Sequence, residues 1–284
     1  MPVITAKELQ EKIPKLKGKF GERIIEVLMK LLSVDEVNDL YDRNCQWQGA
    51  DFAGALMRDI GVDYGIGNPE RLAQLPEGAF ITVSNHPYGH IDGIMLVDLI
   101  GHIRNDFKVM VNQFLAMIRA MSPNFIQVVP KGDEDTSPHA TSIGGVRETL
   151  LHLREGHPVG FFPSGAVSDY APKELRIRDR EWQASVLRII QKASLPVIPI
   201  RFFDRNSMAF YRLGLIDWKV RLLRLPGEVF NKRGKTVRLG IGETVTPEMQ
   251  AACGSLEDLG AMLRRSVYDM PLPESFVKRS ELHI

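Results

Sequence analysis

The sequence predicts an α/β fold, with a single mixed sheet flanked by helices and a helical hairpin in front of it. Three observations support this. Short β-rich runs alternate with helix-like stretches, as expected when helices pack on a sheet. No internal repeat or Pro/Gly/Ser-rich linker divides the chain. A length of 284 residues at 44% hydrophobic composition provides enough apolar side chains for one large core.

The first sixty residues predict the helical hairpin. Apolar residues recur at three- and four-residue spacing over 20–32, which is typical of an amphipathic helix. Ser33 and Glu36 then match a capping box, which predicts that a second helix begins there. We therefore assign residues 1–60 to a helical appendage and 61–284 to the main domain. The hairpin can pack on the core or lie at a membrane interface, and the sequence leaves both open.

Six strands and two intervening helices are predicted in the main domain. The strand segments contain the β-branched and aromatic residues that favour a sheet. They are 80–84, 108–111, 125–129, 159–162, 197–203 and 236–241, and the helices are 142–154 and 179–192.

Charge and cysteine content exclude several classes of protein. The net charge is +1, so the chain lacks the overall positive charge of a nucleic-acid coat protein, and no nucleic-acid partner is expected. The two cysteines, Cys45 and Cys253, form no C-x-x-C motif, so neither a disulfide framework nor a thiolate zinc site is predicted. Charged residues throughout the first thirty positions and the lack of ~18 consecutive apolar residues argue against a signal peptide and a membrane span. We expect a cytoplasmic protein, peripheral on the inner face of the cell membrane.

One stretch is locally basic. Residues 201–238 contain ten Lys or Arg and three Asp or Glu, a balance of 10 − 3 = +7, which leaves 1 − 7 = −6 for the rest of the chain. Aromatic residues are interspersed. This combination suits an anionic membrane surface or an acidic carrier protein, although a solvated basic face would look the same.

The strand at 80–84 leads into a Pro/Gly-rich turn that contains Asn85, His86 and His90, followed by Asp92. Imidazole is the natural general base for a hydroxyl group, and a nearby carboxylate can orient it. His86 and Asp92 are therefore a candidate catalytic pair. Ordinary turn polarity is one alternative. Metal binding by His86, His90 and Asp92 is another, but no second ligand cluster appears, and Pro87 opposes a helical His pair.

Two further segments change this interpretation. The segment 160–168 reads Gly-Phe-Phe-Pro-Ser-Gly-Ala-Val-Ser, and 195–200 reads Leu-Pro-Val-Ile-Pro-Ile. Together with Asn85-His86, they resemble in order and spacing three of the four blocks of the glycerolipid acyltransferase superfamily, the lysophosphatidate acyltransferase (PlsC-like) group. The resemblance covers about residues 75–245 and points to the hemolysin-type, aminolipid-synthesising branch. It implies that His86 and Asp92 are catalytic and that neither a metal nor a cofactor is required.

The departures from the family pattern concern the acceptor. Five residues, not four, separate His86 from Asp92, so the turn must absorb one residue, and Gly89 could do so. In the third block Ser164, Ala166 and Val167 replace the family's Glu, Thr and Arg, and that Glu and Arg are implicated in holding glycerol phosphate. Basic candidates for the acceptor are Lys131, from a loose second block, and Arg176 and Arg178. The resemblance assigns the remaining substrate contacts to Asn85, Phe162, Pro163, Ser164, Gly165, Ser168 and Pro199.

The resemblance implies O-acyl transfer from acyl carrier protein or acyl-CoA as co-substrate. The altered third block favours a lyso-aminolipid acceptor, such as lyso-glycine or lyso-ornithine lipid, in bacterial membrane lipid synthesis. Lysophosphatidate is the alternative acceptor. A metal-dependent hydrolase and a non-catalytic lipid-binding module are the alternatives from other classes. The hydroxyl of Ser164 or a backbone N–H near Gly165 are candidate donors to the oxyanion.

Overall fold

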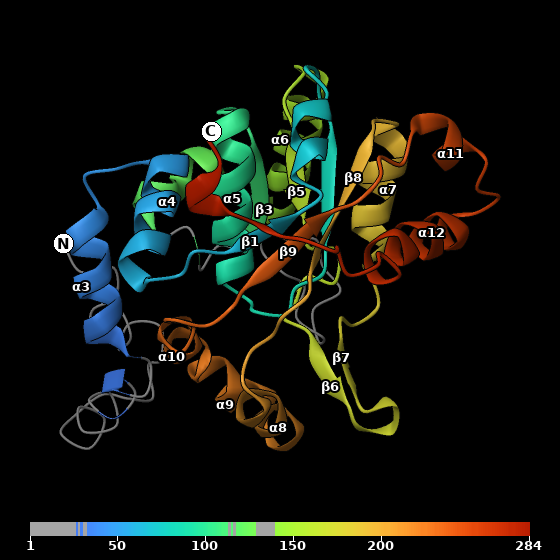
Figure 1. Ribbon diagram of the computed structural model, residues 1–284. Helices are drawn as coiled ribbons and strands as arrows, with labels where there is room; N and C mark the ends of the chain where they lie inside the picture. Colours follow the sequence, from blue (N-terminus) through green and yellow to red (C-terminus); the bar gives the residue numbers. More distant parts are fainter. Residues whose placement is uncertain (1–26, 28, 31–32, 113–114, 116–117, 129–139) are drawn as a thin grey trace.

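An eight-stranded mixed sheet forms the centre of the chain (Figure 1). The computed structural model describes residues 27, 29–30, 33–112, 115, 118–128 and 140–284. The strand order is β10-β1-β9-β8-β2-β5-β3-β4, in which β9 is antiparallel to β8, β10 is antiparallel to β1, and the other neighbours are parallel. The strands are β1 (Gly65–Gly67), β2 (Ile81–Ser84), β3 (Lys108–Asn112), β4 (Phe125–Val128), β5 (Val159–Phe161), β8 (Val197–Phe202), β9 (Arg238–Ile241) and β10 (Val277–Lys278).

The prediction of a mixed sheet flanked by helices is confirmed, and each of the six predicted strands is present. Strand β10, at one edge of the sheet, and its neighbour β1 were not predicted, because they contain only two and three residues and lack an alternating pattern.

Helices cover both faces of the sheet. In β8, Val197 faces one apolar cluster and Ile198 the other, as the two-residue period of a strand requires. One cluster includes α4 (Gly49–Ile60) and α5 (Ile91–Ile103), and the opposite one includes α6 (Ala140–Arg154), α7 (Ala184–Ala193) and α12 (Leu256–Tyr268). This continuous burial on both faces explains why the central strands read as apolar runs.

The described residues test only part of the predicted N-terminal hairpin. Helix α3 (Val34–Asn44) begins where expected, but the predicted capping box is wrong. Ser33 has φ +48°, and its side chain makes no capping hydrogen bond. Most of the predicted helix over 20–32 lies outside the described residues. Because α4 packs into the same core as α5, it is integral to the fold; the domain boundary at residue 60 stays a prediction.

Two insertions extend from the carboxyl ends of β5 and β8. After β5 the chain forms a hairpin of β6 (Asp169–Ala171) and β7 (Arg176–Arg178), joined by the 3-10 helix η5 (Pro172–Glu174). After β8 it forms α8 (Met208–Ile216), α9 (Trp218–Leu223) and α10 (Leu225–Phe230). Both insertions lie at the lower end of the sheet in Figure 1. Because β2, β5 and β8 are parallel, the loop that follows β2 is at this same edge.

The remaining elements are short. They are the 3-10 helices η2 (Pro69–Gln74), η4 (Arg119–Asn124) and η6 (Arg279–Glu281), and the helix α11 (Pro247–Ala251). None of the helices in the described part of the chain combines the length and hydropathy needed to cross a bilayer.

Candidate active site

His86 and Asp92 meet at the carboxyl edge of the sheet. His86 lies in the loop directly after β2, and Asp92 lies in the first turn of α5. His86 Nδ1 is 2.8 Å from Asp92 Oδ2, and the imidazole is 17% exposed while the carboxylate is fully buried. The Nδ1–H direction falls outside hydrogen-bond geometry, so a rotation of the ring is needed to align the pair.

The loop fixes the Asp92 carboxylate through its own backbone. Asp92 Oδ2 accepts hydrogen bonds from the N–H groups of Tyr88 and Gly89, both at 3.1 Å, and Oδ1 accepts one from Gly93 N–H at 3.0 Å. Gly89 adopts φ +82°, a left-handed conformation that favours glycine, within the turn between His86 and Asp92. A Cβ at Gly89 would also approach Leu225 Cδ2 to 3.0 Å, so the position requires glycine for two reasons.

The two histidines of the loop differ in protonation. Burial lowers the pKa of His86, but the charge and contact of Asp92, with a smaller contribution from Asp179, outweigh burial and raise its pKa above 6.5. Burial dominates at His90 and lowers its pKa to about 4, so His90 is neutral near pH 7. His86 is therefore the histidine of this loop that can exchange a proton near neutral pH.

A metal site at these residues is not supported by the donors. The Asp92 oxygens already accept hydrogen bonds from three N–H groups, and His86 Nδ1 lies 2.8 Å from Oδ2. Among the described residues, no group of three or more His, Cys, Asp or Glu side chains is placed to hold a metal ion.

The turn after β5 packs against His86. The ring of Phe162 stacks on His86 with centroids 4.1 Å apart. Gly165 adopts φ +65°, and a Cβ there would come within 2.0 Å of Gln183 Nε2, which explains the glycine. Gly165 N–H donates to Phe162 O, and the Ser164 hydroxyl donates to Ala166 O. The Ser164 hydroxyl and the N–H of Gly165 itself are thus engaged within the turn, and either would have to break a hydrogen bond to bind the oxyanion.

A buried aspartate that sequence reasoning missed connects the two loops. Asp179 Oδ1 accepts hydrogen bonds from His86 N–H at 3.1 Å and from Ser168 Oγ at 2.6 Å, while Ser168 N–H donates to His86 O. Burial raises the pKa of the Asp179 carboxyl despite these donors. Asp179 follows the alternating charges of Arg176 and Arg178, so it resembled part of a solvated face, and no local signal distinguished it.

Three other residues that were predicted to contact the substrate make hydrogen bonds that join neighbouring parts of the backbone. Asn85 donates to and accepts from the backbone of Phe202, at 2.9 and 2.8 Å, and so joins the ends of β2 and β8. Pro199 is buried within β8 in register with Val83, and its carbonyl accepts from Gly242 N–H. Pro163 O accepts from Gln183 N–H. Lys131 lies outside the described residues.

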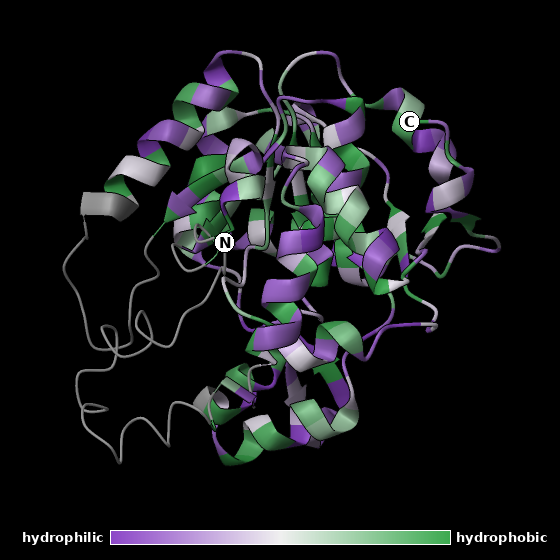
Figure 2. Cartoon of the chain, turned by 90° about the vertical axis from the view of Figure 1, so that its left-hand side faces the viewer, coloured by the Kyte–Doolittle hydropathy of each residue, from purple (hydrophilic) through white to green (hydrophobic). Residues whose placement is uncertain are grey.

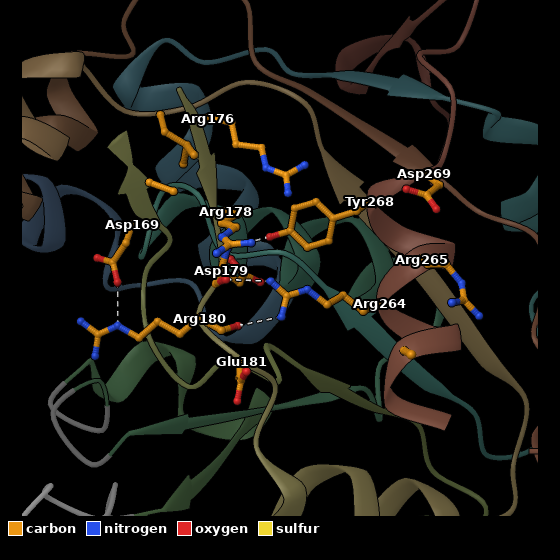
Figure 3. A pocket seen from close by; sticks show the side chains of 13 residues that line it. Asp169, Arg176, Arg178, Asp179, Arg180, Glu181, Arg264, Arg265, Tyr268 and Asp269 are labelled. Atoms are coloured by element: carbon orange, nitrogen blue, oxygen red, sulfur yellow. Dashed lines mark hydrogen bonds and ion pairs between the residues drawn. The ribbon is translucent and has the colours of Figure 1, made fainter. Parts of the chain in front are cut away.

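Arg176 and Arg178 line a pocket of about 600 Å³ between the β6–β7 hairpin and α12. Each forms an ion pair with Glu174, at 2.5 and 2.7 Å. Figure 3 shows Arg264 and Tyr268 reaching from α12 toward Asp179, where Arg264 donates to Asp179 O and Tyr268 Oη accepts from Asp179 N–H. The pocket therefore adjoins the His86 loop through Asp179.

Much of the basic stretch 201–238 has internal partners. Arg221 is buried and pairs with Asp169 at 2.6 Å, Lys232 pairs with Glu228, and Arg238 pairs with Asp204. Arg201 donates to the carbonyls of Tyr268 and Met270. These cations hold the insertions together, so only part of the charge counted in the sequence is available at the surface.

The comparisons with known proteins agree on one chemistry. A family model described as "Acyltransferase" matches residues 7–273. The chain is 27% identical over 247 residues to the lyso-glycine lipid O-acyltransferase of Bacteroides thetaiotaomicron, covering 84% of this chain and 86% of that protein. It is 28% identical over 246 residues to the protein of the same name from Phocaeicola vulgatus, covering 81% of this chain and 84% of that protein.

Proposed function

The chain belongs to the acyltransferase family, and from this premise we propose that it transfers a fatty acyl group to the hydroxyl of a lyso-aminolipid in bacterial membrane lipid synthesis. The observation that carries the proposal is the His86–Asp92 pair at 2.8 Å on the carboxyl edge of the sheet. The names of the two relatives, each matched over more than four fifths of its length, support lyso-glycine lipid as the acceptor.

The pair suits direct transfer without an acyl-enzyme. With Nδ1 facing Asp92, Nε2 of His86 is the nitrogen that takes the proton of the acceptor hydroxyl. The oxygen attacks the thioester carbonyl, and the tetrahedral intermediate collapses by breaking the C–S bond. The thiolate then takes the proton from His86, which returns to its starting form. Asp92 stabilises the imidazolium formed between these steps.

The donor is a thioester of acyl carrier protein or of coenzyme A. Both carry the same reacting group, so the His86 chemistry does not distinguish them. We propose that the reaction takes place on the inner face of the cell membrane, because the acceptor is a lipid.

The acceptor is expected to carry a carboxylate in place of a phosphate ester. Ser164 and Val167 stand where the family pattern has the Glu and the Arg that are implicated in holding glycerol phosphate. Arg176 and Arg178, in the pocket that adjoins Asp179, are our candidates to bind the amino-acid carboxylate. For this, the two arginines would release Glu174 and form ion pairs with the substrate carboxylate instead.

An acceptor comparison tests the proposal. Purified protein receives acyl carrier protein loaded with a radiolabelled fatty acyl thioester and, in parallel, lyso-glycine lipid, lyso-ornithine lipid or lysophosphatidate. Transfer to the amino-acid lipids and not to lysophosphatidate is expected. Preferential transfer to lysophosphatidate would overturn the acceptor assignment, and no transfer to any of the three would overturn the proposed function.

A further inference from the structure

Large apolar side chains are exposed where α8 ends and α9 begins. Ile216 is 84% exposed and Trp218 is 50% exposed. Leu215, Val220 and Leu222 in the same segment are 54%, 39% and 38% exposed. We call the five residues together the apolar ridge: Leu215, Ile216, Trp218, Val220 and Leu222. Large exposed apolar side chains concentrated in one short segment of a globular protein point to an interaction surface.

The helices of the ridge hold the catalytic loop on their buried side. Tyr211 of α8 is fully buried and donates its hydroxyl to Pro87 O at 2.6 Å. Arg221 of α9 is also buried and donates to Ser168 O at 3.3 Å. The same two helices therefore contact the loops of the active site on one side and expose the ridge on the other.

The ridge lies at the end of the molecule where the active-site loops are. In Figure 1, α8 and α9 extend below the carboxyl edge of the sheet. Figure 2 shows hydrophobic colour on the helices at this lower end. A surface touched by the ridge would thus face the edge that carries His86.

Charge favours an anionic surface. Arg205, Arg212 and Arg224 are exposed in or beside the helices α8, α9 and α10, and the ion pairs among the described residues of this region do not include them. Asp217, which lies between Ile216 and Trp218 in the sequence, caps the start of α9: its Oδ1 accepts a hydrogen bond from Val220 N–H at 3.3 Å. Tryptophan and branched aliphatic side chains flanked by arginine are the composition of helices that lie at anionic membrane interfaces.

We propose that the apolar ridge docks on the anionic lipid surface of the membrane that holds the acceptor. This inference rests on the proposed function, because a lyso-lipid keeps its acyl chain in the bilayer and presents its hydroxyl near the head groups. Insertion of the ridge among those head groups brings the His86 edge to the lipid, so the acceptor need not leave the membrane.

Vesicle binding tests the proposal without any catalytic step. The intact protein is sedimented with vesicles of phosphatidylethanolamine and phosphatidylglycerol, and with vesicles of phosphatidylcholine. The ridge variant is Ile216→Ser/Trp218→Ser. The control is Leu151→Ser/Met249→Ser, since these residues are 53% and 49% exposed and belong to other helices, α6 and α11. Circular dichroism and thermal denaturation verify that each variant is folded.

We expect the wild type and the control to prefer the anionic vesicles, and the ridge variant to bind them at least about tenfold more weakly. Equal binding by the ridge variant, or no wild-type binding, would overturn the proposal. So would a wild-type dimer that the ridge variant converts to a monomer, because the ridge would then join two copies of the chain.

An activity arm separates docking from catalysis. With a short-chain, water-soluble lyso-glycine acceptor, the ridge variant should keep its rate while losing transfer to acceptor embedded in vesicles. Loss of both would make the ridge a structural support of the catalytic loop and overturn docking. Ridge-dependent vesicle binding by a wild type that acylates no lyso-lipid would remove the proposed function and leave the docking surface standing.

Discussion

The backbone N–H of His86 donates to Asp179 Oδ1 at 3.1 Å, which joins two loops 93 residues apart in the sequence. Ser168 Oγ donates to the same oxygen at 2.6 Å. One buried carboxylate therefore fixes the His86 loop relative to the turn that stacks Phe162 on the ring of His86. Its charge also contributes to the raised pKa of His86.

Asp179→Asn should shift the pH dependence of acyl transfer. Since the Asp179 charge raises the pKa of His86, its removal lowers that pKa, and because His86 acts deprotonated, the acidic limb of kcat/KM moves to lower pH. Full pH profiles measure this. Glu181→Gln is the control, because Glu181 lines the same pocket and has no contact with His86 in the described structure. An unchanged acidic limb in Asp179→Asn would show that the carboxylate has only a structural role.

The wild-type acidic limb should itself have its midpoint above pH 6.5. Activity requires neutral His86, so the rate rises as the pH passes upward through the raised pKa of this residue. Initial rates over a series of buffers at constant ionic strength provide the test. A midpoint near pH 4 would instead match His90, whose pKa burial lowers to about 4, and would contradict the assigned base.

Removing the orienting carboxylate should nearly abolish transfer. Asp92→Asn cannot stabilise the imidazolium of His86, and we expect kcat to fall by about 10²–10⁴-fold with the fold retained. His90→Ala is the matched substitution in the same loop and should be mild. Rates and circular dichroism of the two variants decide the matter. Equal inactivation of both would restore the metal hypothesis, which a metal analysis of the purified protein would then have to support.

Gly89→Ala should destabilise the protein and reduce its activity together. The position has φ +82°, and the new Cβ would lie 3.0 Å from Leu225 Cδ2, so we expect a loss of about 1–3 kcal/mol in the free energy of unfolding. Urea denaturation measures the loss. Gly78→Ala, where a Cβ meets nothing within 4 Å, should be nearly neutral. Equal stability of the two variants would mean that the catalytic loop tolerates the strain.

Local patterns predicted six strands of the sheet, including β4 at one edge, but not β1, β10 or the insertions. The runs that contain Ile81 and Val197 are buried on both faces, so their composition alone marks them as strands. Strand β10 is only two residues long and exists because it pairs with β1, a contact between distant segments that leaves no local pattern. At Ser33 the sequence predicted an interaction that does not form. The residues match a capping box, but Ser33 adopts a left-handed conformation and its side chain makes no capping hydrogen bond.

In the candidate site, too, some residues could be identified from local sequence and others could not. His86, Asp92 and Phe162 were predictable because each belongs to a short contiguous block. Asp179 was not, because its role depends on a buried bond to another loop. Arg221 was counted as surface charge, yet it is 2% exposed and holds Ser168 O and Asp169. Burial of a charged side chain against a distant partner cannot be inferred from spacing.

The central claim is that His86 acts as the base for acyl transfer to a lyso-glycine-type hydroxyl. The most direct measurement is single-turnover transfer of a radiolabelled fatty acyl group from acyl carrier protein to lyso-glycine lipid. It is made with the wild type and with His86→Ala, and mass spectrometry identifies the product. We predict O-acylated glycine lipid from the wild type and a rate about 10²–10⁴-fold lower from His86→Ala, which remains folded. Product formation by His86→Ala at the wild-type rate would contradict the account.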